Sequence, residues 1–197
     1  MNAPRLTADA RRQQIIDVAI DEFGRAGYYG TSMNDIAEAA GVTKPVLYQH
    51  FDSKADLYRA LLDEVGARLL EQIAKATSDA VDGRDRTERG FAAYFHWVAD
   101  HQPEFSLLFG GSARHDGEFS TQIRRINDDA AISIADLIEI DIDREHRQTL
   151  AHGLVGLAEG ASRRLVAAGE PFDPDAVARI VSQLAWAGLR AVDGPGA

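Results

Sequence analysis

The chain has 197 residues, 45% of them hydrophobic and 26% charged, with a formal net charge of −10. These values are typical of a globular protein of one or two domains. The absence of cysteine excludes disulfides, thiolate chemistry and zinc sites built on cysteine. The sequence has no run of about 18 apolar residues, and its first 14 residues lack an apolar signal core. We therefore expect a cytoplasmic protein that does not enter a membrane.

The negative charge lies mostly in the later part of the chain. Residues 1–60 hold seven Lys or Arg against eight Asp or Glu, whereas residues 61–197 hold fourteen against twenty-three. An acidic protein is repelled by nucleic acid, so the total charge argues against that class of partner. The first part of the chain is nearly neutral, so this charge argument does not exclude DNA binding by residues 1–60.

The first 41 residues predict two helices. Thr7 is placed to cap a helix that runs to about Gly27, and apolar residues recur within it at helical spacing. Ser32 and Asp35 form a capping box that starts the second helix, with Asp in place of the usual Glu. Gly41 ends that helix, because glycine readily adopts the left-handed conformation of a helix C-cap.

Residues 43–50 predict a third helix of about two turns, which is only marginally stable by itself. Leu47 and Phe51 lie four residues apart and face inward together. We expect them to close a small core with the apolar side chains of the first two helices. Their burial turns the opposite face of the third helix outward.

The outward face of this third helix suits the major groove of DNA, because a short, rigidly held helix with hydrogen-bond donors is what enters it. Lys44 can reach guanine or a phosphate, and the Pro45 ring suits a thymine methyl group. Tyr48 can bind a phosphate, and Gln49 can pair with adenine. Lys54 lies in the first turn of a helix, where a cation interacts unfavourably with the helix dipole. Because helix stability therefore does not explain a lysine at this position, we expect Lys54 to bind phosphate. The start of the second helix offers further phosphate contacts. The predicted DNA-binding residues are Ser32, Asn34, Thr43, Lys44, Pro45, Tyr48, Gln49, His50 and Lys54.

The rest of the chain also predicts helices. A long helix over 53–80 is opened by a capping box of Ser53 and Asp56, and the segment "DGRDR" at 82–86 is the best candidate domain boundary. No strand is expected, since the alternating segment 138–143 is short and isolated. Further helices are predicted near residues 87–101, 103–109, 118–139, 144–168 and 174–191, the last of them started by Asp173 and Pro174.

The segment "GYYGTSMNDIAEAAGVTKPVLYQHFDSKADLYRALL" at 27–62 resembles the DNA-binding region of the tetracycline-repressor (TetR) family of bacterial transcriptional regulators. The shared pattern consists of Gly27-Tyr28, Thr31-Ser32, Ile36-Ala37, Ala40-Gly41-Val42-Thr43, Leu47-Tyr48, His50-Phe51, Ser53-Lys54 and Leu57. It covers roughly residues 7–62 and is specific, because its positions agree in spacing. The resemblance implies a homodimer with about nine helices per chain, a palindromic DNA operator, repression by occupancy, and release by a small molecule bound in the C-terminal domain.

The predicted fold class is therefore all-α, with two domains. Residues 1–52 form a three-helix helix-turn-helix domain that binds DNA, and the helix over 53–80 links it to the rest of the chain. Residues 81–197 form a helical domain for ligand binding and dimerisation. The resemblance gives only the architecture of this second domain, because it offers no motif there.

Aromatic residues are frequent in the first part of the predicted C-terminal domain. A domain this rich in aromatics can hold an apolar pocket, so we expect an apolar or amphipathic effector there. Core packing alone is the stronger interpretation for any single one of these side chains. The expected ligand-binding residues are Phe91, Phe95, Phe105 and Phe109.

Glycines at helical spacing mark a smooth stripe within residues 152–165. Each glycine costs about 1 kcal/mol of helix stability relative to alanine, which suggests that another backbone approaches closely. The functional interpretation is a homodimer seam, and packing within one chain is the alternative. The predicted dimer residues are Gly153, Gly156, Leu157, Gly160, Ile180 and Leu184.

An enzyme is the first competing interpretation, and the sequence argues against it. It has no nucleophile elbow and no phosphate loop. No two histidines have the spacing of two metal ligands on one helix face, so we expect no metal and no cofactor. The second competitor is a helical interaction or sensor protein without DNA binding. Activation of transcription in place of repression also stays open.

Overall fold

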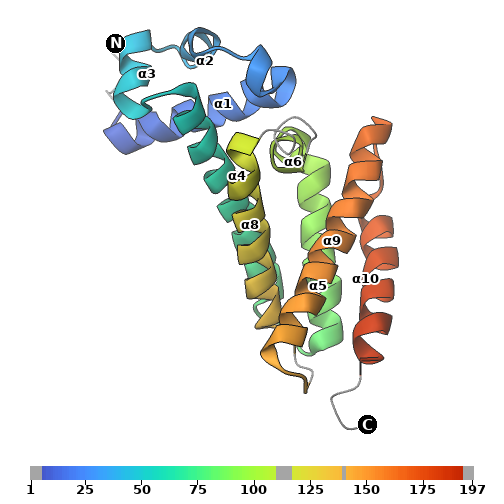
Figure 1. Cartoon of the computed structure of the whole chain (residues 1–197). Coiled ribbons are helices and arrows are strands. Elements are labelled where there is room, and N and C mark those ends of the chain that lie inside the picture. Colours follow the sequence, from blue (N-terminus) through green and yellow to red (C-terminus); the bar gives the residue numbers. More distant parts are fainter. Residues whose placement is uncertain (1–5, 110–116, 139–140, 193–197) are drawn as a thin grey trace. The chain divides into compact units, whose positions relative to one another are not determined.

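The computed structural model describes residues 6–109, 117–138 and 141–192 (Figure 1). Over these residues the chain forms nine α-helices and no β-strand, which confirms the all-α prediction. The helices belong to two compact units. The N-terminal unit comprises residues 1–65 with 103–122, and the C-terminal unit comprises residues 66–102 with 123–197.

The N-terminal unit begins with three helices that pack on one another, α1 (Ala8–Gly30), α2 (Met33–Ala39) and α3 (Lys44–His50). Its other parts are the first turns of α4 (Lys54–Thr77), most of α6 (Gln102–Phe109) and the start of α8 (Gly117–Ala135). The predicted end of the first helix near Gly27 is observed as a kink, because this residue has a φ of 71° while helical structure resumes up to residue 30. The predicted long helix over 53–80 is shorter than expected.

The start signals of these helices are mostly those predicted. Thr7 accepts a hydrogen bond from the Ala10 N–H, and the capping box of Ser32 and Asp35 is complete. Thr43 precedes α3, but its side chain makes no capping hydrogen bond. Pro45 at the second helical position removes one of the two N–H groups that such a cap can use, and the N–H of Val46 at the third position remains.

The second capping box was predicted in a slightly different form from the one observed. The Ser53 hydroxyl accepts from the Asp56 N–H at 3.0 Å, as expected. The Asp56 carboxylate, however, accepts from the Asp52 N–H at 3.1 Å and thus reaches back one residue further. The start of α4 is therefore tied to the residue that directly follows Phe51.

The core of the N-terminal unit contains the residues that were expected to hold the third helix. Leu47 and Phe51 are 0% and 1% exposed, and Phe23 and Ile36 are equally buried. Val42 is only half-buried. The expected orientation of the third helix is confirmed, since its apolar side is fully inside.

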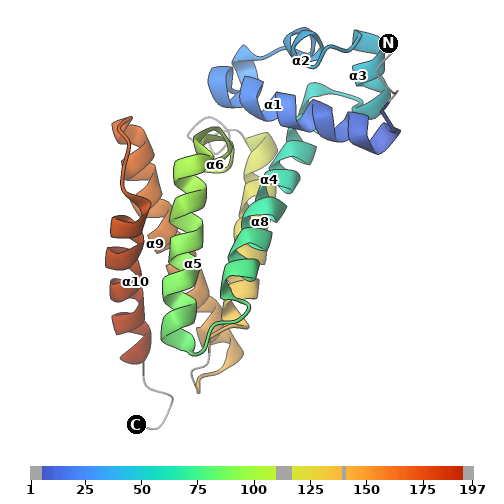
Figure 2. The same ribbon diagram turned by 180° about the vertical axis from the view of Figure 1, so that it is seen from behind.

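The C-terminal unit contains the rest of α4 and α8 together with α5 (Gly83–Asp100), α9 (Arg144–Ala168) and α10 (Pro174–Arg190). Helices α5 and α10 lie side by side along most of their length (Figures 1 and 2). Asp173 accepts hydrogen bonds from two N–H groups at the start of α10, as predicted. The predicted helix over 118–139 ends at Ala135, and residue 139 lies outside the described residues.

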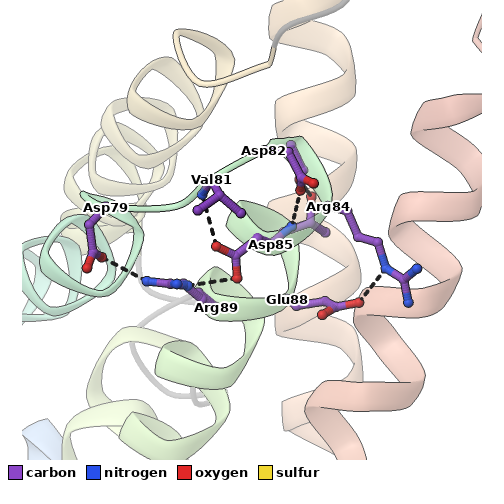
Figure 3. A network of polar contacts seen from close by, with 9 residues as sticks. Asp79, Val81, Asp82, Arg84, Asp85, Glu88 and Arg89 are labelled. Atoms are coloured by element: carbon purple, nitrogen blue, oxygen red, sulfur yellow. Dashed lines mark hydrogen bonds and ion pairs between the residues drawn. The ribbon is translucent and has the colours of Figure 1, made fainter.

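A polar network ties the turn between α4 and α5 to the start of α5 (Figure 3). Asp82 caps α5 by accepting from the Asp85 N–H at 2.8 Å. The Asp85 carboxylate accepts from the Val81 N–H and from Arg89, which also reaches Asp79 at 2.8 Å. The segment 82–86, expected as a domain boundary, thus begins a helix within one compact unit.

Candidate functional site

The exposed face of α3 carries most of the side chains predicted to contact DNA. Thr43, Lys44, Pro45, Tyr48 and Gln49 are exposed, and His50 is half-buried. Tyr48 has 42% of its surface accessible, whereas Leu47 beside it has none. The helix is thus held by its apolar side and offers a stiff surface with hydroxyl, amide and ammonium groups. Its contact with DNA stays a prediction.

The start of α2 carries the other two predicted contacts of this region. Ser32 and Asn34 are both exposed. The Ser32 hydroxyl accepts from the Asp35 N–H at 3.2 Å, and the Asp35 carboxylate accepts from the Ser32 N–H at 2.8 Å. The backbone N–H of Ser32 first, and then the Ser32 hydroxyl, lower the pKa of the Asp35 carboxyl. An ionised carboxylate at this helix start disfavours a phosphate directly beside it.

Lys54 has a structural role that the sequence did not reveal. Its ammonium donates to the carbonyl oxygens of Tyr28 at 2.8 Å and of Thr31 at 3.1 Å, and it lies 4.3 Å from the centroid of the Tyr28 ring. The argument that this lysine has a weak structural reason is therefore wrong, because it ties α4 to the end of α1. Since an ammonium has three donors, one of them is left for a phosphate.

Arg12 of α1 is a further cation beside α3. Its guanidinium lies 4.9 Å from the centroid of the Phe51 ring, directly after α3. The neighbouring Arg11 binds the Gln14 carboxamide at 2.6 Å, and Gln14 donates to the Ala40 carbonyl at 3.1 Å. The side chains of α1 thus join the turn between α2 and α3. No local sequence pattern could have paired Arg12 with Phe51, because 39 positions separate them.

The four aromatic residues predicted to line an effector cavity fall into different units. Phe91 and Phe95 belong to α5 in the C-terminal unit and stack with centroids 6.3 Å apart. Phe105 and Phe109 belong to α6 in the N-terminal unit, with centroids 5.0 Å apart. All four side chains are buried. Each unit therefore contains only one of these two aromatic pairs, and an effector site within one unit can include only that pair.

The predicted dimer residues form an open face of the C-terminal unit. A Cβ added to Gly153, Gly156 or Gly160 would meet no neighbouring atom of the described residues within 4 Å. Ile180 and Leu184 of α10 expose 66% and 63% of their surfaces, and Leu157 is half-buried. Packing within the described part of the chain thus gives no reason for the glycines.

Other kinds of site are sparse in the described residues. A small pocket of about 80 Å³ in the C-terminal unit is lined by Ile132, Ala135, Asp136, Arg144, Arg147 and Gln148, which the sequence did not indicate. Nowhere in residues 6–109, 117–138 and 141–192 do three potential metal-ligating side chains cluster. The same residues contain no helix long and apolar enough to cross a membrane.

Two family models match the chain. The model described as "Bacterial regulatory proteins, tetR family" matches residues 15–61, and the model described as "Tetracyclin repressor-like, C-terminal domain" matches residues 84–188. The HTH-type transcriptional activator FasR of Mycolicibacterium smegmatis is 32% identical over 187 residues, which cover 94% of this chain and 85% of that protein.

Solved structures have the same fold. A TetR-like transcriptional regulator from Rhodococcus sp. RHA1 is 29% identical, with a TM-score of 0.76 over 95% of this chain and 100% of the other. The regulator FadR from Bacillus subtilis, solved in complex with stearoyl-CoA, has a TM-score of 0.77 over 89% of this chain and 98% of its own. Its identity is 17%, so this likeness concerns the fold.

Proposed function

Because this chain belongs to the tetR family of bacterial regulatory proteins, and is therefore a DNA-binding transcriptional regulator, we propose that it acts as a ligand-released repressor. Residues 1–52 bind a palindromic operator as part of a homodimer. Residues 81–197 bind the effector and hold the two copies together, with α4 as the link. The single observation that carries this proposal is the outward face of α3 on a fully buried Leu47.

Binding to DNA follows from the stiffness and chemistry of this face. Lys44, Gln49 and the ring of Pro45 read base edges in the major groove, and Tyr48 contacts the backbone. Lys54 adds a phosphate contact through the donor that its two carbonyl partners leave over. The DNA-binding domains (residues 1–52) of the two copies, called heads below, must lie about 34–36 Å apart to reach successive major grooves.

Dimerisation is supported by the open face of α9 and α10. The glycine stripe allows another helix to approach closely, and Ile180 and Leu184 supply apolar area that the chain itself leaves exposed. Covering such area removes it from water and stabilises association. The two DNA-binding heads are thereby held in one assembly.

Release by a small molecule is supported by the apolar interior of the C-terminal unit. Phe91 and Phe95 are buried on α5 and favour an apolar or amphipathic effector. An effector that binds more tightly to a conformation with a different head spacing shifts the population away from the DNA-bound form. No catalytic step is part of this mechanism, and turnover of a small molecule would contradict it.

The test is DNA binding of the full chain, measured by fluorescence anisotropy with the DNA that flanks its gene. Lys44→Ala is expected to relax the preference at one base pair, at a discrimination cost of about 1–3 kcal/mol. Lys54→Met is expected to weaken all sequences alike and to reduce the dependence on salt. Lys75→Ala is the matched control, since Lys75 is exposed near the end of α4.

A folded dimer that shows no specific complex at moderate salt would favour the alternative of a helical interaction protein. A second candidate function is activation, because FasR is named a transcriptional activator. A promoter–reporter strain separates the two. Deleting the regulator raises expression if it represses and lowers expression if it activates.

A further inference from the structure

Three polar side chains lie in the interior of the C-terminal unit, where α5 packs against α9. Tyr94 of α5 is 7% exposed, and Glu159 and Ser162 of α9 are 6% and 0% exposed. Glu159 and Ser162 are three residues apart and therefore share one face of α9. On α5 the Tyr94 ring also packs against Phe95 in an edge-to-face arrangement, at a centroid distance of 5.3 Å.

The hydroxyls of Tyr94 and Ser162 are buried, and neither meets a partner at full hydrogen-bond geometry among the described residues, although the Ser162 hydroxyl lies near enough to Tyr94 to lower its pKa. This is unusual for Ser162, because other hydroxyls in the helices of this chain bond to the carbonyl four residues earlier. Examples are Thr77, Thr87, Ser133 and Thr149. Folded proteins rarely leave such groups without a partner, so these two hydroxyls call for an explanation.

The surrounding charges show which kind of group fits between these helices. Arg163 lies 3.4 Å from the Glu159 carboxylate and balances its charge. Burial raises the pKa of Tyr94, the Ser162 hydroxyl lowers it, Glu159 raises it and Arg163 lowers it. Ser162, Glu159 and Arg163 therefore lie around the Tyr94 hydroxyl, and the charges of Glu159 and Arg163 oppose each other. A buried ligand ion would lack a counter-charge of its own here, which makes a neutral group the favoured occupant.

We propose that the hydroxyls of Tyr94 and Ser162 hold the polar end of the effector, which is a mostly apolar molecule with one neutral hydrogen-bonding group, such as an alcohol or an amide. Such a group can accept from one hydroxyl and donate to the other. The apolar body then lies along the aromatic side chains of α5. This inference rests on the proposed function, because it assigns the chemical class of the effector.

The test uses a series of ten-carbon probes with the full-length protein: 1-decanol, decanamide, decanoate and decylamine. Binding is followed by intrinsic tryptophan fluorescence, since Trp97 is buried one turn from Tyr94 on α5. We expect the alcohol and the amide to bind, and the two charged probes to bind at least about tenfold more weakly, because each would be buried as an unpaired ion.

Two substitutions separate a ligand anchor from ordinary packing. Tyr94→Phe and Ser162→Ala each remove one hydroxyl, and each is expected to weaken 1-decanol binding by about threefold to tenfold, the value of one neutral hydrogen bond. Neither should lower the melting temperature of the free protein, because neither hydroxyl makes a hydrogen bond of full geometry there. Ser182→Ala is the matched control, since that buried hydroxyl already donates to the Arg179 carbonyl at 3.2 Å.

Several results would overturn the inference: no binding of any probe, tighter binding of decanoate, or unchanged 1-decanol affinity in both variants. A lower melting temperature of either variant would also overturn it, because the hydroxyl would then have a partner within the free protein. Operator binding is measured on the same samples. Its absence in the wild type contradicts the proposed function, whereas intact operator binding without probe binding contradicts this inference alone.

Discussion

Substituting Leu184 by Glu tests the proposed dimer face on α9 and α10. Leu184 exposes 63% of its surface, and Ile180 one turn earlier exposes 66%. Fully burying a Leu side chain contributes about 1.5–3 kcal/mol, so covering the exposed part of Leu184 contributes about 1–2 kcal/mol per copy. A symmetric dimer contains the residue twice, and Leu184→Glu therefore removes about 2–4 kcal/mol from association.

This loss corresponds to an increase of the dimer Kd by about 30-fold to 1,000-fold, because 1.4 kcal/mol is a factor of ten. Burying two carboxylates in the interface adds to the effect. The fold of the single chain should be unchanged, since the side chain is already exposed there. Sedimentation velocity over a range of protein concentrations measures the Kd, and circular dichroism checks the helical content.

Val81→Glu is the control for the added charge. Val81 is 83% exposed and belongs to the turn between α4 and α5, outside the proposed face. The Val81→Glu variant should therefore dimerise with the same Kd as the wild type. The reasoning is refuted if Leu184→Glu dimerises as tightly as the wild type, or if the wild type is monomeric at every concentration.

Two further predictions concern a close contact and a titrating pair. Gly24→Ala would place a Cβ 2.6 Å from the Cβ of Pro103, so we expect a loss of about 1–3 kcal/mol in urea unfolding; an unchanged midpoint would contradict this packing. The Gln148 carbonyl and the Asp128 carboxylate raise the pKa of His152 above 6.5. Its stabilisation is therefore complete below about pH 6.5 and is lost as the pH rises through the raised pKa. His152→Gln should lower the free energy of unfolding more at pH 6 than at pH 8.5, and an equal loss at both would disprove the pairing.

Much of the local structure was predictable from short sequence patterns. The caps of α1, α2 and α10 at Thr7, Ser32 and Asp173 were all foreseen. Each depends on a side chain and a backbone N–H no more than three residues apart. The orientation of α3 was predictable for a similar reason, because Leu47 and Phe51 repeat at helical spacing.

The errors arose where a local pattern met a competing constraint. Thr43 precedes α3 but makes no capping hydrogen bond, and Pro45 leaves it only the N–H of Val46 as a donor. The helix opened by Ser53 is shorter than predicted, since the polar network around Arg89 holds the next turn in another conformation. Where a helix begins and ends thus depends on which residues come together at its termini.

The sequence by itself determined which segments are helical and which face of α3 turns outward, because caps and helical spacing act over a few residues. Only the tertiary structure decided that Lys54 binds the carbonyls at the end of α1. It alone assigned Phe91 and Phe105 to different compact units and brought Tyr94 toward Ser162. These partners are far apart in the chain, and their meeting depends on how whole helices pack, which no short pattern encodes.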